Sequence, residues 1–113
     1  MKKLMHKKTI ELPEHIVACI IETAKRFPEI EEVVIFGSWA LGNAKRGSDI
    51  DLAVSGRNVT SKIVASFQYF LEEETEIPHF FDVVHMETVC NDALKEHIVD
   101  KGITIYVKRP RDK

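Results

Sequence analysis

The stretch that decides the fold is Gly37-Ser38-Trp39-Ala40-Leu41-Gly42-Asn43-Ala44-Lys45-Arg46-Gly47-Ser48-Asp49-Ile50-Asp51. An apolar run, 33–36, leads into it, and apolar residues alternate along 50–54 as the chain leaves it. We therefore predict a buried strand over 32–37 that stops at a Gly-Ser turn, and a second strand over 49–55. Because residues i and i+2 of a strand point to the same face, Asp49 and Asp51 should lie side by side.

Two adjacent carboxylates repel each other unless a cation lies between them, and paired oxygen ligands suit Mg²⁺. A third acid, Asp82, interrupts an apolar run that predicts a strand over 80–85. A carboxylate in such a run is usually paired or bound to a metal. If the two acidic strands are neighbours, Asp49, Asp51 and Asp82 form a triad able to hold two Mg²⁺ ions for displacement at phosphorus. Asp82 can also orient or deprotonate the nucleophile.

The residues around the turn predict a site for a triphosphate. Gly37 allows the backbone to approach a ligand closely. The Ser38 hydroxyl and the amide groups at the start of a short helix over 39–44 can hold phosphate oxygens. The following loop, 45–48, adds Lys45, Arg46 and Ser48 beside the incoming nucleotide.

Composition limits the class of protein. With 113 residues, 44% hydrophobic and 30% charged, the chain fits one globular domain with a modest core. A formal charge of −2 argues against general nucleic-acid binding. No apolar run approaches the ~20 residues that span a bilayer, and none follows the N-terminal lysines as in a signal peptide, so we expect a cytoplasmic protein without membrane contact. Cys19 and Cys90 lack metal-ligand spacing and are expected to be reduced, buried thiols.

The remaining pattern completes a small α/β (α+β) fold, a mixed sheet packed with helices. We predict a helix over 13–26, a helix capped by Thr60 or Ser61, a helix capped by Asn91 or Asp92, and a last strand over 103–107. The domain should span 13–107, with an N-terminal tail, 1–12, and a basic C-terminal tail, 108–113. The run 72–74 is expected to be a solvated helix face. The buried stripe of the last helix is expected to contain Ala93, Leu94, His97 and Ile98, with His97 and also His85 as polar tips at the core edge.

Gly-Ser, ten residues, Asp-x-Asp and a later strand Asp together resemble the signature of the DNA polymerase β-like nucleotidyltransferases. Over 14–107 the chain is similar to the minimal nucleotidyltransferases (MNT family), including the MntA-like antitoxins. The resemblance implies a polymerase β-like palm in which Asp49, Asp51 and Asp82 bind metal and the Gly-Ser turn holds the triphosphate of ATP. It also implies a helical partner of the HEPN type, in several such pairs an RNase toxin that receives AMP from ATP on a tyrosine.

One departure from this family concerns Trp39 and Leu41, which stand where the family commonly has Arg. The expected phosphate contacts therefore shift to Lys45 and Arg46. Two alternatives to a protein adenylyltransferase stay open. One is an antitoxin or regulatory subunit that masks its partner without turnover, and the other is a transferase acting on a small molecule such as an aminoglycoside. The sequence does not specify the acceptor, the base or the oligomeric state.

Overall fold

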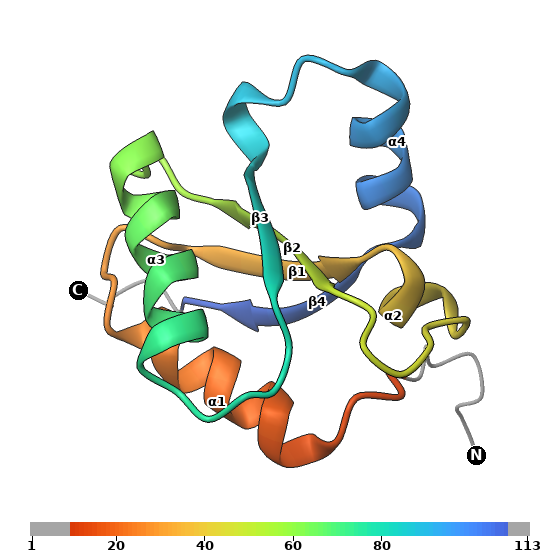
Figure 1. The fold of residues 1–113 in the computed structure, drawn as a ribbon. Helices are drawn as coiled ribbons and strands as arrows, with labels where there is room; N and C mark the ends of the chain where they lie inside the picture. Colours follow the sequence, from red (N-terminus) through yellow and green to blue (C-terminus); the bar gives the residue numbers. More distant parts are fainter. Residues whose placement is uncertain (1–9, 109–113) are drawn as a thin grey trace, which may run out of the picture.

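Residues 10–108 are described by a computed structural model (Figure 1). The terminal predictions for 1–9 and 109–113 lie outside the described residues. Along the chain the elements are α1 (Glu14–Lys25), β1 (Glu32–Phe36), α2 (Ser38–Leu41), β2 (Ile50–Ser55), α3 (Ser61–Glu73), β3 (Phe81–His85), the 3₁₀ turn η1 (Met86–Thr88), α4 (Asp92–Lys101) and β4 (Ile103–Val107). Every helix and strand predicted from the sequence is present, and η1 is an addition.

The strands form one mixed sheet, as predicted, and the structure shows that their order is β3-β2-β1-β4. β1 is antiparallel to β2 and to β4, whereas β2 and β3 are parallel. The two acidic strands are therefore neighbours. Their starts lie at the same end of the sheet as the end of β1, where the Gly-Ser turn begins. The topology thus gathers the predicted site at one end of the sheet.

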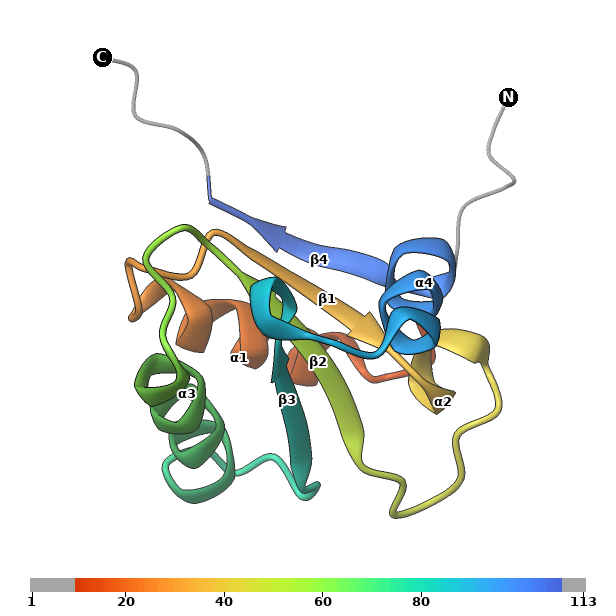
Figure 2. The ribbon, with the colours of Figure 1, turned by 90° about the horizontal axis from the view of Figure 1, so that it is seen from above.

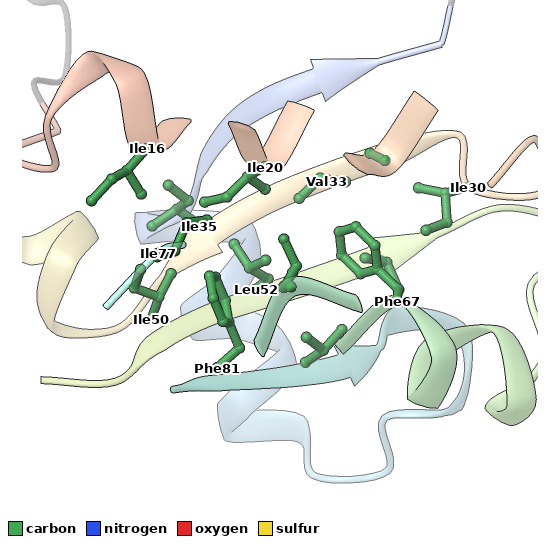
Figure 3. Packing of buried hydrophobic residues seen from close by; sticks show 14 of the residues in the cluster. Ile16, Ile20, Ile30, Val33, Ile35, Ile50, Leu52, Phe67, Ile77 and Phe81 are labelled. Carbon is green, nitrogen blue, oxygen red and sulfur yellow. The ribbon is translucent and has the colours of Figure 1, made fainter. Parts of the chain in front are cut away.

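The two faces of the sheet are covered unequally (Figure 2). α1 and α3 pack on one face and enclose the main core, which Figure 3 shows from close by. α4 covers part of the opposite face over a small cluster formed by Phe36, Ala53 and Ile98. Ile50, Leu52 and Val54 are completely buried in the main core, so the intervening residues of β2 face the α4 side. The sheet face that carries α4 is therefore less completely covered by helices than the face that carries α1 and α3 (Figure 2).

Three details differ from the predictions. β2 begins at Ile50, so Asp49 precedes the strand and is exposed. α2 ends at Leu41, because Gly42 adopts a left-handed conformation with φ 82° that closes the helix. Ala93 is exposed, since α4 contacts the sheet through Leu94 and Ile98 on a narrower stripe than expected.

The acidic run at the end of α3 is not simply a solvated face. Glu72 accepts a hydrogen bond from the Phe81 amide at 2.7 Å, and Gln68 accepts one from the Val83 amide at 3.2 Å. β3 is an edge strand, and these side chains satisfy amides that a further strand would otherwise pair. This contact needs the tertiary packing of α3 beside β3.

Both cysteines are free, as expected, but only one is even partly buried. Cys19 is half-buried on α1, whereas Cys90 is exposed in the turn before α4, so the prediction of two buried thiols is wrong for Cys90. In the part of the chain that the structure describes, none of the helices has the length and apolar character needed to cross a bilayer.

Candidate active site

Asp51 and Asp82 are direct neighbours on the parallel strands β2 and β3. They project from the face that carries α4, because the residues on either side of them, such as Leu52 and Val83, are buried in the main core. Asp51 is half-buried and Asp82 is exposed. The pair therefore combines a half-buried carboxylate with one that is accessible to an incoming molecule.

Asp49 lies one residue before β2 and is exposed. It still acts on Asp51, because burial first, then the charge of Asp82 and then the charge of Asp49 raise the pKa of the Asp51 carboxyl. Within residues 10–108, no three His, Cys, Asp or Glu side chains converge into a ready-made metal cluster. The charges of Asp82 and Asp49 therefore both act on Asp51, although the three side chains do not form a three-ligand cluster among the described residues.

Gly37 is placed directly against Asp51. It has φ 76°, a conformation that side chains rarely adopt, and a Cβ at this position would overlap the Asp51 carboxylate. The turn therefore requires glycine for two reasons, backbone conformation and space. The result is a backbone turn and a carboxylate in contact at the end of the sheet.

Burial, followed by the charges of Asp82 and then Asp49, raises the pKa of Asp51 from 3.8 to about 6. A protonated His97 would act in the opposite direction. The ionised Asp51 is thus held in crowded, negatively charged surroundings. A divalent cation would relieve that repulsion, so the donor set fits Mg²⁺ in both chemistry and electrostatics.

Hydrogen bonds between its first and last residues, Lys45 and Ser48, close the predicted phosphate loop, 45–48. The Ser48 hydroxyl accepts a hydrogen bond from the Lys45 amide at 2.8 Å, and the Ser48 amide donates to the Lys45 carbonyl at 2.9 Å. Lys45 and Arg46 are exposed, and neither side chain forms an ion pair with the described residues. Their charges are available to a ligand, whereas the Ser48 hydroxyl is already engaged. The role of each in nucleotide binding stays a prediction.

Trp39, at a position where the family commonly has Arg, makes a contact that the sequence does not reveal. Its indole Nε1 donates to the Ser48 carbonyl at 3.2 Å, and His79 Nδ1 lies 3.3 Å from the same oxygen. The Trp39 and His79 rings meet edge to face at 5.5 Å between centroids. Both rings thus hold the residue that precedes Asp49. Leu41, at the other such position, is exposed.

His97 is the site residue that sequence reasoning missed. Its Nε2 accepts a hydrogen bond from the Gly37 amide at 3.3 Å, and its ring packs edge-on against Phe36. From the sequence, His97 was expected only to be a polar tip at the core edge. No spacing signal links it to Gly37, because the two residues are 60 positions apart.

Comparison with known proteins identifies the family. The profile of the family described as "Polymerase beta, Nucleotidyltransferase" matches residues 19–111, so the chain belongs to this nucleotidyltransferase family. A comparison with curated proteins finds no match.

Solved structures support the same fold. A toxin–antitoxin complex crystallised with AMP-PNP superimposes with a TM-score of 0.67 at 20% identity, covering 87% of this chain and 76% of that chain. The toxin–antitoxin MntA-HepT superimposes with a TM-score of 0.66 at 17% identity, covering 85% and 74%. At these identities the likeness establishes the shared fold.

Proposed function

We propose that this chain is a Mg²⁺-dependent nucleotidyltransferase that moves AMP from ATP to a hydroxyl group, namely a tyrosine of a HEPN-type toxin for which it is the antitoxin. The observation that carries the proposal is the pairing of Asp51 and Asp82 on neighbouring strands beside the Gly37 turn. Family membership supports nucleotidyl transfer, and the fold shared with toxin–antitoxin complexes supports the antitoxin role. We assign the catalytic domain to 13–107 and the protein to the cytoplasm.

In the proposed reaction the acceptor oxygen forms a bond to the α-phosphorus of ATP. The bond from that phosphorus to the oxygen bridging to the β-phosphate breaks, and pyrophosphate leaves with the electron pair. The hydroxyl proton passes to the carboxylate of Asp82, the more exposed member of the pair. The Ser38 hydroxyl and the amides at the start of α2, which the Gly37 turn positions, steady the triphosphate, so that the reacting atoms stay in line.

Asp51 and Asp82, joined by Asp49, would hold the Mg²⁺ ions. When bound, two such ions neutralise charge on the attacking and leaving oxygens. The crowded negative charge around Asp51 supports this assignment, because an ionised carboxylate in such surroundings favours a cation.

The test is co-expression with a helical toxin encoded nearby, followed by mass spectrometry of that partner. We expect an added AMP on one tyrosine that depends on ATP, Mg²⁺ and Asp51. Asp51→Asn should abolish this modification. Glu73→Gln, a substitution at an exposed position of α3, should leave it intact. AMP transfer by this chain alone to a free small molecule, with the toxin unmodified, would overturn the protein acceptor in favour of the aminoglycoside-like alternative.

A second candidate is an antitoxin that masks its partner without turnover. Trp39 favours it, because the indole donates to the Ser48 carbonyl where the family commonly has a cation. Toxin neutralisation that survives Asp51→Asn, without any AMP on the partner, would support this candidate. A gain of transfer in Trp39→Arg would show that the missing cation limits activity.

A further inference from the structure

His97 links α4 to the Gly-Ser turn, just beyond the last paired residues of β1 and β2. The last registered pair of β1 and β2 is Phe36 with Asp51, so Gly37 lies beyond that ladder. The Gly37 amide instead donates to His97 Nε2 at 3.3 Å. The His97 ring is half-buried and rests edge-on against Phe36, with 6.0 Å between ring centroids. The side chain is therefore fixed both by packing and by its hydrogen bond.

This hydrogen bond defines the chemical state of the ring. Since the Gly37 amide is the donor, Nε2 carries a lone pair and the ring proton is on Nδ1. On the Asp51 side, the carboxylate occupies the space that a Gly37 side chain would fill. Gly37 is thus held between a neutral acceptor from α4 and a carboxylate from β2. Glycine adopts φ 76° without steric cost, so these two contacts select this one conformation from the many that the residue could adopt.

We infer that His97 is a positioning residue, whose Nε2 holds the Gly37 turn in the conformation that receives the triphosphate. The inference rests on the proposed nucleotidyl transfer. His97 would not contact the reacting atoms. It acts through the Gly37 backbone, so that the turn is already formed before the nucleotide arrives and ordering it costs no binding energy.

Two substitutions separate the hydrogen bond from the ring contact. His97→Phe keeps a ring against Phe36 and removes the acceptor, whereas His97→Gln removes the ring and retains an acceptor oxygen at a similar reach. The first readout needs no nucleotide and is hydrogen exchange of the Gly37 amide by NMR. We expect exchange to accelerate in His97→Phe and to stay slow in His97→Gln. If His97→Phe does not fold, His97→Met provides a second variant without the acceptor.

The second readout is ATP binding with Mg²⁺, followed through Trp39, the only tryptophan of the chain, which lies two residues after Gly37. Loss of one hydrogen bond should weaken binding about three- to tenfold in His97→Phe, with near wild-type affinity in His97→Gln. In the transfer assay the KM for ATP should rise in His97→Phe with little change in kcat, because the turn binds ground state and transition state alike.

The outcomes are distinct. Protection of Gly37 that is equal in wild type and His97→Phe would overturn the inference, as would a His97→Gln variant as impaired as His97→Phe. If the wild type binds no ATP, the proposed function fails, and the exchange measurement still decides whether His97 holds the turn.

Discussion

Asp51→Asn is expected to stabilise the metal-free protein at neutral pH and to have little effect in mild acid. Burial and the charges of Asp82 and Asp49 raise the pKa of Asp51 from 3.8 to about 6 in the folded chain. The folded state therefore binds this proton more tightly than the unfolded state does. The stabilising effect of the proton is fully present below pH 3.8 and is lost as the pH rises through about 6. At neutral pH the wild type retains an ionised carboxylate in unfavourable surroundings.

The magnitude follows from the difference between the two pKa values. At about 1.4 kcal/mol for each tenfold change in proton affinity, a difference of about 2 corresponds to roughly 3 kcal/mol. Asp51 is only half-buried, and water and salt screen part of the repulsion. We therefore expect Asp51→Asn to raise the free energy of unfolding by about 1–2 kcal/mol at about pH 7.5, and by much less at about pH 4.

The assay is urea unfolding in the presence of a chelator, followed by circular dichroism at the two pH values. Glu73→Gln is the control, since this exposed α3 residue lies away from the acidic pair and should show no pH-dependent gain. Asp82→Asn should give a smaller gain than Asp51→Asn, because it removes only one of the charges acting on Asp51. An Asp51→Asn protein no more stable than wild type at neutral pH, or stabilised equally at both pH values, would refute the reasoning.

Three further predictions concern the turn and the ligand. Gly37→Ala should lower the melting temperature and cost at least about 1–3 kcal/mol, because it combines a positive φ with overlap against Asp51; an unchanged melting temperature would contradict the geometry. Lys45→Ala/Arg46→Ala should weaken ATP binding, measured by calorimetry. Because the loop is exposed, the loss should be smaller than the ~1.5–3 kcal/mol of a buried charged hydrogen bond. An unchanged affinity would exclude the loop from phosphate binding. ATP with Mg²⁺ should raise the melting temperature more than ATP with a chelator, and Asp49→Asn/Asp51→Asn should abolish the difference; equal shifts with and without metal would indicate a nucleotide site that is independent of the acids.

Local patterns were enough to predict the elements and the faces of the strands. The alternation along β2 and the apolar run around Asp82 reflect which side chains can be removed from water, and that preference depends on neighbouring residues only. The turn at Gly37 and the placement of Asp51 on the face opposite Ile50 and Leu52 followed from the same reasoning, because glycine is typical of turns and successive strand residues alternate between faces. The boundaries moved by a few residues, as with Asp49, because hydrogen-bond pairing between strands decides where a strand begins.

The tertiary structure alone decided which groups meet across the chain. That β2 and β3 are neighbours, and hence that Asp51 and Asp82 form a pair, depends on sheet order. The contact between His97 and Gly37 depends on how α4 packs over the end of β1. The raised pKa of Asp51 follows from the same packing, because both the burial of this carboxyl and the charge of Asp82 beside it depend on residues that are distant in sequence. The sequence determined the chemistry available at the site, and the chain path determined which of those groups act on one another.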